Sequence, residues 1–214
     1  MIISPGRNLI FVHIPKTGGT SLALALEGRA MKDDILIGDT PKARRRRKRL
    51  KGVASRGRLW KHSTLSDIEG LVSPAFIAGA FTVTLVRNPW DRLVSYYHWL
   101  RAQSFDHPAV QVAKALDFSG FLAHPDMQRA IRAMPYAAYM TGSDGVERTS
   151  LYIRLEAFAE EAAPLWAHLG FKLELPHENA SKRPGDYRAA YSEADAALVG
   201  QLCAEDIARF GYRF

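Results

Sequence analysis

The sequence predicts an α/β fold, and two stretches of the chain carry that prediction. In each, a short run of β-branched and aromatic residues is followed by a turn and then by a helical pattern; the runs are Asn8–Ile14 and Phe81–Val86. Buried strands have this composition, and strands that alternate with helices are typical of α/β architectures. The length of 214 residues suits one domain spanning 1–214.

The first strand-to-helix unit is clearly bounded. Pro5-Gly6 precedes the strand Asn8–Ile14, and the turn Pro15–Gly19 follows it. Proline and consecutive glycines exclude regular structure in that turn. Strong helix formers then run from Thr20 to Glu27 and end at Gly28, which predicts a helix over this stretch.

Residues 29–61 contain no periodic pattern, and we expect them to form a functional or mobile insertion. Between Lys42 and Lys61 there are eleven Lys and Arg residues and no acidic residue, while the whole chain has a net charge of +7. The basic character is therefore local. Such a block is a solvated surface or grips an anionic partner.

The second half of the chain continues the pattern. After the strand Phe81–Val86, Asn88 and Pro89 are an N-cap and a first-turn proline, and they predict a helix over Trp90–Ala102. Residues 108–142 are expected to be helical in pieces. The predicted breaks in those pieces are at Gly120, Pro125 and Pro135.

A third strand and two further helices complete the prediction. The strand is Leu151–Leu155, and a helix over Ala157–Leu169, interrupted near Pro164, ends at Gly170. Ser192-x-x-Asp195 is a capping box that opens one last helix. Apolar residues on one face of that helix are Leu198, Leu202, Cys203, Ile207 and Phe210.

Composition excludes several classes of protein. An apolar content of 47% argues against a disordered chain, and a single cysteine argues against a disulfide scaffold. No apolar run reaches the ~18 residues of a membrane span, and no signal peptide is evident, so we expect a cytoplasmic protein. The sequence has no H-E-x-x-H or C-x-x-C cluster, so no metal is expected.

The glycine turn is the first chemical signal. Two glycines let backbone amides converge on an anion, and the start of the next helix adds unpaired amides and a positive dipole end. It is not a Walker A loop, because its lysine precedes the glycines. The alternative is a tight turn that carries a lysine by chance. The candidate phosphate- or sulfate-binding residues are Lys16, Thr17, Gly18, Gly19, Thr20 and Ser21.

The end of the second strand is the other signal. Arg87 closes this strand and so lies at its carboxyl end, the edge at which open α/β sheets bind ligands. Ser95 lies in the second turn of the helix that follows. A guanidinium and a hydroxyl near one helix start suit a second phosphate group.

Together these stretches resemble the two nucleotide-binding signatures of sulfotransferases: H-I-P-K-T-G-G-T-S and V-R-N-P-W-D-R-L-V-S-Y-Y. In this form they are similar to the carbohydrate, heparan-type branch and its short bacterial relatives. That family takes its sulfuryl group from 3′-phosphoadenosine 5′-phosphosulfate (PAPS) and leaves 3′,5′-adenosine bisphosphate. The resemblance implies a P-loop-like, three-layer α/β domain with a central parallel sheet flanked by helices. It also implies that residues 16–21 hold the 5′-phosphosulfate and that Arg87 and Ser95 hold the 3′-phosphate.

Sulfuryl transfer to an alcohol needs a base for the hydroxyl proton, and histidine suits this role near neutral pH. His62 lies between the two motifs, and its position resembles that of the catalytic histidine in heparan-type members. On residues alone, a solvated loop histidine is an equal reading. By the same resemblance Lys16 stabilises the charge that builds during transfer.

A late basic stretch, Ser181-Lys182-Arg183, is similar to the family's loop that closes over the nucleotide. A surface turn before Pro184 is the equal alternative.

The sequence thus predicts a PAPS-dependent sulfotransferase acting on an acceptor hydroxyl, of a carbohydrate and potentially an acidic one. Two rivals remain. One is an ATP-dependent phosphotransferase of the P-loop type. The other is a non-enzymatic polyanion-binding protein that uses residues 42–61. Nucleic acid is not an expected partner.

Overall fold

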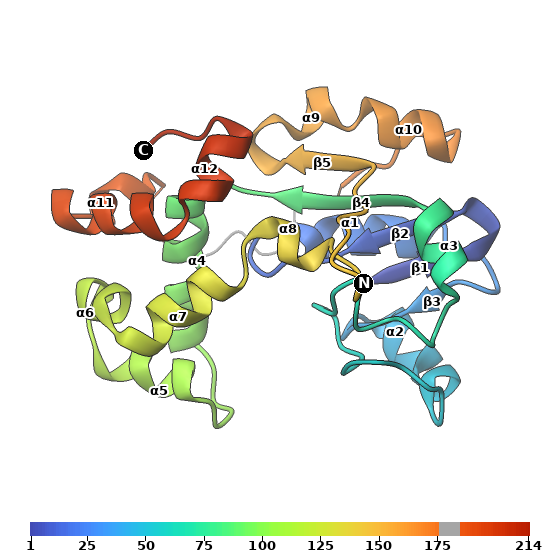
Figure 1. Ribbon diagram of the computed structural model, residues 1–214, viewed down its shortest axis with the longest axis horizontal. Helices are drawn as coiled ribbons and strands as arrows, with labels where there is room; N and C mark the ends of the chain where they lie inside the picture. Colours follow the sequence, from blue (N-terminus) through green and yellow to red (C-terminus); the bar gives the residue numbers. More distant parts are fainter. Residues whose placement is uncertain (176–184) are drawn as a thin grey trace. The chain divides into compact units, whose positions relative to one another are not determined.

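The structure is a computed structural model, and it describes residues 1–175 and 185–214 (Figure 1). The chain divides into two compact units. The first, here called the sheet unit, comprises Met1–Val86 and Tyr136–Glu178; the second, here called the helical unit, comprises Arg87–Pro135 and Asn179–Phe214.

A five-stranded sheet with the order β3-β1-β2-β4-β5 forms the centre of the sheet unit (Figure 1). Its parallel strands are β2 (Leu9–Val12), β4 (Phe81–Val86) and β5 (Leu151–Arg154). These correspond to the strands predicted from the sequence, which confirms the α/β class.

Two short strands make the sheet mixed rather than wholly parallel. β1 (Ile2–Ser4) pairs antiparallel with β2, and β3 (Ile35–Leu36) pairs antiparallel with β1. A 3₁₀ turn over Pro5–Arg7 reverses the chain between β1 and β2, with Asn8 in the left-handed conformation at φ 48°. Strands of two or three residues are too short to show a period, and the sequence prediction therefore missed them.

Helices of the sheet unit cover the sheet and connect its strands. Leu22 and Leu26 of the first helix pack with alternating residues of the strands, such as Phe11 and Val83, in one buried cluster. Every second residue of a strand points to the same face of the sheet, so these residues form the face that the helix covers. The helices are α1 (Gly19–Gly28), α2 (Pro41–Arg46), α3 (Pro74–Gly79), α8 (Tyr136–Tyr139), α9 (Phe158–Glu161) and α10 (Ala163–Leu169).

The predicted interruption near Pro164 is confirmed, because α9 and α10 are separate helices with Ala162 between them. Pro164 lies in the first turn of α10, where its missing N–H costs no helical hydrogen bond. Gly170 ends α10 in the left-handed conformation.

The basic segment contains more structure than the sequence predicted. Residues 29–61 hold β3, α2 and a 3₁₀ turn over Arg47–Leu50. Thr40 caps α2 by accepting from the Ala43 amide, while its hydroxyl donates to the Glu27 carboxylate at 2.6 to 2.7 Å. These elements are held by caps and tertiary contacts, neither of which leaves a periodic pattern.

The helical unit is built from short helices around one apolar cluster that includes Trp90, Tyr97 and Phe121. As predicted, the Asn88 side chain caps the helix after β4 by accepting from the Trp90 amide. The helices are α4 (Pro89–Arg101), α5 (Pro108–Ala115), α6 (Phe118–Ala123), α7 (Pro125–Ala133), α11 (Glu193–Leu202) and α12 (Ala204–Phe210). A 3₁₀ turn spans Tyr187–Ala190.

Two details of the helical unit differ from the prediction. Gly120 does not break a helix but lies inside α6, where its amide donates to the N-cap carboxylate of Asp117. The last helix is divided at Cys203 into α11 and α12. The predicted capping box is confirmed, since Ser192 and Asp195 bond reciprocally at the start of α11. Within the described ranges, no helix has both the length and the apolar character that a membrane crossing requires.

Candidate functional site

The glycine turn connects β2 to α1 at the carboxyl edge of the sheet. Lys16 has a φ of 67° and Gly18 a φ of 81°, so the backbone passes twice through the left-handed region before α1 begins at Gly19. This conformation is inexpensive for glycine but strained for lysine. The turn therefore holds two left-handed residues directly before the start of α1.

The first turn of α1 offers unsatisfied amides. Ser21 donates its amide to the Gly18 carbonyl at 3.1 Å. The amides of Gly18, Gly19 and Thr20 donate to no acceptor in the part of the chain that the structure describes. Such amides, together with the helix dipole, form an anion-binding site. The geometry thus fits a phosphate or sulfate group at the position predicted from the sequence.

The hydroxyl side chains of the turn do not play equal parts. Thr17 is fully buried, and its hydroxyl donates to the Ile14 carbonyl at 2.9 Å. The hydroxyl has one hydrogen, and that hydrogen is used within the turn. Of the polar groups of Thr17, only the backbone amide is therefore a candidate donor to an anion. Thr20 and Ser21 are half-buried at the start of α1, and their hydroxyls have no partner among the described residues.

Gly19 is required by the close approach of His13. A Cβ at Gly19 would lie 2.7 Å from Nε2 of the His13 ring, and nearer still to its Cδ2. His13 is the penultimate residue of the predicted strand and lies just after β2. This contact could not be predicted from local sequence patterns, because it depends on how the turn folds against the end of the strand.

His13 also holds the predicted base. Nδ1 of His62 lies 2.7 Å from the His13 carbonyl oxygen, and the two rings meet edge to face at 4.7 Å. A carbonyl oxygen only accepts, so Nδ1 donates. In the neutral His62 ring the lone pair is therefore on Nε2. Trp60 also meets the His62 ring edge to face, with ring centroids 5.0 Å apart.

His13 itself is buried and neutral at pH 7. Burial is the main cause that lowers the pKa of its imidazole well below 6.5, and the nearby His62 lowers it further. A neutral ring packs against Gly19 without a desolvated charge. His13 therefore links the anion-binding turn to His62 through its ring on one side and its carbonyl on the other.

The second predicted anion site lies at the start of the helical unit. Arg87 follows directly on β4, and its Nε donates to Oδ2 of Asp91, one turn into α4, at 2.9 Å; Nη2 donates to the same oxygen. The Arg87 side chain is 14% exposed. Asp91 was not among the predicted site residues, although its i+4 spacing from Arg87 is a signal for this ion pair.

Ser95 lies on α4 and is 5% exposed. Its hydroxyl has no hydrogen-bond partner in the described ranges. Within the described residues, the buried side-chain oxygen that lacks a partner is Oδ1 of Asp34, so the Ser95 hydroxyl is accessible and can donate to an oxygen of a ligand. The predicted residues Ser181, Lys182 and Arg183 lie outside the described residues.

The glycine turn lies at the carboxyl edge of the parallel strands. β2 and β4 are neighbouring parallel strands, paired from Leu9 with Phe81 to Val12 with Thr84. Both strands therefore end at the same edge of the sheet. This is the edge where α/β sheets bind nucleotides.

A family model described as "Sulfotransferase family" matches residues 1–165, a region that includes the glycine turn, His62 and Arg87. The chain belongs to the sulfotransferase family. No curated protein matches it.

Among solved structures, mouse sulfotransferase SULT7A1 complexed with PAP is similar to this chain at 15% sequence identity. The match covers 95% of this chain and 86% of the mouse chain, with a TM-score of 0.51. It confirms the predicted sulfotransferase-like α/β fold with helices flanking a central sheet.

Within the sheet unit, the start of α1 is a candidate anion site and His62 is a candidate base. The amides at the start of α1 can stabilise negative charge, and Nε2 of His62 can accept a proton. No group of three or more His, Cys, Asp or Glu side chains that could hold a metal occurs within residues 1–175 and 185–214.

Proposed function

We propose that this sulfotransferase moves a sulfuryl group from PAPS to a hydroxyl of a carbohydrate acceptor. The observation that carries the proposal is the double role of His13. Its ring packs on Gly19 in the anion-binding turn, and its carbonyl accepts from Nδ1 of His62. One residue thus fixes the anion site and the candidate base relative to each other within the sheet unit.

The donor would be held at both of its anionic ends. The amides of Gly18, Gly19 and Thr20, with the Lys16 ammonium, are the proposed ligands of the 5′-phosphosulfate. Arg87 and Ser95 are the proposed ligands of the 3′-phosphate, and Ser181, Lys182 and Arg183 remain candidates for the same end. The donor supplies the activated sulfuryl group and leaves as 3′,5′-adenosine bisphosphate (PAP), the nucleotide bound in the mouse structure.

His62 is the proposed general base. As the acceptor oxygen forms its bond to sulfur and the bond from sulfur to the phosphate oxygen breaks, Nε2 takes the hydroxyl proton. Lys16 and the first-turn amides stabilise the negative charge that builds on the departing oxygen. Positioning and electrostatic stabilisation then account for most of the acceleration, as in phosphoryl transfer.

Of the two rival readings, the family match disfavours the ATP-dependent phosphotransferase. The lysine of the turn also precedes the glycines, unlike that of a Walker A loop. Polyanion binding by residues 42–61 is compatible with sulfotransferase activity, since a basic surface can bind an anionic acceptor. The carbohydrate acceptor is supported by the resemblance of both motifs to the carbohydrate branch.

The test is transfer of labelled sulfate from PAPS to a panel of carbohydrates and small alcohols. His62→Ala is expected to lower kcat by about 10²- to 10⁴-fold, the usual contribution of a general base, and to leave the dissociation constant for PAP unchanged. Lys16→Ala is expected to weaken PAP binding as well. The exposed His98 provides the matched control, because His98→Ala removes a histidine outside the site. Full activity of the His62 variant would refute its role, and no transfer from PAPS by the native chain would refute the function.

A further inference from the structure

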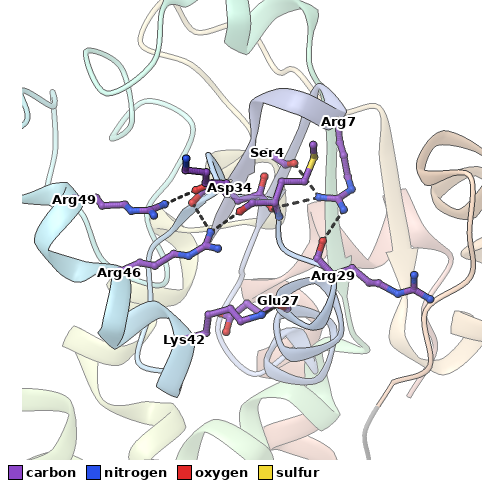
Figure 2. A network of polar contacts seen from close by, with 10 residues as sticks. Ser4, Arg7, Glu27, Arg29, Asp34, Lys42, Arg46 and Arg49 are labelled. Atoms are coloured by element: carbon purple, nitrogen blue, oxygen red, sulfur yellow. Dashed lines mark hydrogen bonds and ion pairs between the residues drawn. The ribbon is translucent and has the colours of Figure 1, made fainter.

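Two sets of cations in the basic block differ in their contacts. Lys42 and Arg46 of α2 and Arg49 of the following 3₁₀ turn fold back onto backbone carbonyls of residues 27–34 (Figure 2). Arg46 donates to the carbonyls of Met31 and Asp34 at 2.8 and 3.0 Å, and Arg49 donates to that of Lys32 at 2.6 Å. These three cations, here called the fastened set, hold the basic block against residues 27–34 through hydrogen bonds.

The other set lines a cavity of about 600 Å³ next to the end of β3. Of this set, Arg44 lies on α2, Arg47 and Lys48 lie in the 3₁₀ turn, and Lys51 follows that turn. Residues Leu59–Lys61 complete another part of the lining. A volume of this size is that of a ligand pocket and is unlike a flat charged face.

The cavity carries unneutralised positive charge. Its only carboxylate is that of Asp39, which lies 3.1 Å from Nζ of Lys61 and 3.7 Å from Nη2 of Arg47. Arg44, Lys48 and Lys51 have no carboxylate partner in the part of the chain that the structure describes. Several cations gathered around one hollow repel one another, and an anionic ligand relieves that repulsion.

The cavity adjoins the candidate base. Trp60 lines it, is 43% exposed, and meets the His62 ring edge to face at 5.0 Å. An exposed indole offers an apolar face on which a sugar ring can pack, and its neighbour His62 is where the acceptor hydroxyl must arrive.

We propose that this cavity is the acceptor subsite and that it binds an acidic saccharide, with carboxylate or sulfate groups held by Arg44, Lys48 and Lys51. The proposal rests on the proposed function, because only sulfuryl transfer requires a hydroxyl beside His62. A hollow of about 600 Å³ that is lined by cations and by an indole next to His62 favours a saccharide. A nucleic acid would be gripped along an extended charged surface.

The first test is calorimetric titration without nucleotide, using a tetrasaccharide of alternating glucuronate and N-acetylglucosamine. The neutral N-acetylglucosamine tetramer is the comparison ligand. The native chain is expected to bind the acidic tetrasaccharide at least ~tenfold more tightly. Arg44→Gln with Lys48→Gln is expected to remove most of that preference, since each charge-assisted contact contributes about tenfold.

A matched control separates a specific site from bulk charge. Lys32→Gln with Arg45→Gln removes the same charge from exposed residues that do not line the cavity, and it should change affinity less than about twofold. Equal losses in the two double variants would overturn the proposal. So would equal binding of the two tetrasaccharides, or tighter binding of an oligothymidylate that depends on the same residues.

Titration with PAP keeps the two proposals apart. A chain that binds PAP and transfers sulfate but ignores the acidic tetrasaccharide refutes the subsite and leaves the function standing. A chain that binds the tetrasaccharide through Arg44 and Lys48 but binds no PAP refutes the function. Where transfer to the tetrasaccharide occurs, the cavity variant is expected to raise KM about tenfold with kcat nearly unchanged.

Discussion

The Nδ1 of His62 donates to the backbone carbonyl of His13 across 2.7 Å, although the two residues are 49 positions apart in the chain. The bond selects the tautomer of the neutral His62 ring in which Nδ1 carries the hydrogen and Nε2 is the basic nitrogen. Because the His13 ring also packs on Gly19, a substitution at His13, Gly19 or His62 is expected to displace the other two residues. The first two predictions below follow from this arrangement.

Gly19→Ala is expected to lower kcat about 10²-fold. The new methyl group would overlap the His13 ring, which must move and carry the His62 contact with it, and a displacement of about 1 Å has that order of effect on catalysis. Steady-state kinetics on the best acceptor measure it. Gly28→Ala is the control, because a Cβ there meets nothing within 4 Å. An active Gly19→Ala enzyme would show that the contact does not matter.

Buried, neutral His13 should make the folded chain lose stability in acid. Its pKa is lowered in the fold, so the unfolded chain binds the extra proton first. The stability is fully present above pH ~6.5 and falls below it, with a slope approaching 1.4 kcal/mol per pH unit for this one group. Urea unfolding of the native chain and of His13→Gln between pH 5 and 8 measures it. Parallel curves for the two proteins would contradict the prediction.

Thr17 and Thr20 are expected to respond oppositely to replacement by valine. Thr17→Val leaves the Ile14 carbonyl without its buried donor and should cost about 1–3 kcal/mol of unfolding free energy. Thr20→Val should leave stability nearly unchanged and weaken PAP binding, because its half-exposed hydroxyl has no partner in the described chain. Chemical denaturation and PAP titration of both variants distinguish the roles. A stable Thr17→Val protein with weakened PAP binding would reverse the assignment.

Arg87→Ala is expected to weaken PAP binding about 10²-fold or more. The guanidinium is oriented by Asp91 on the first turn of α4, so its loss would remove the preorganised group that we propose as the partner of the 3′-phosphate. Adenosine 5′-monophosphate, which lacks that phosphate, serves as the control ligand and should bind both proteins alike. If both nucleotides lose affinity equally, Arg87 does not read the 3′-phosphate.

Local signals explain what could be predicted about the site. The glycine turn, Arg87 with its following helix, and the Asn88 cap depend on neighbouring residues in the chain, and each was found from spacing alone. The Asp91 partner of Arg87 was within reach of the same reasoning, since residues four apart meet on a helix. Binding roles for these residues stay predictions until a nucleotide is titrated.

The chain's own order of residues determined the parallel strands β2, β4 and β5 and the helices α1 and α4, because their periodicity, caps and breakers act over a few residues. Tertiary structure alone decided that Thr17 turns inward, that His13 holds His62, and that the basic block separates into fastened and cavity-lining cations. The residue type Lys or Arg does not tell where the side chain points in the folded chain. Which carbonyl or cavity each one reaches depends on the helical phase of α2 and on segments brought near it by folding.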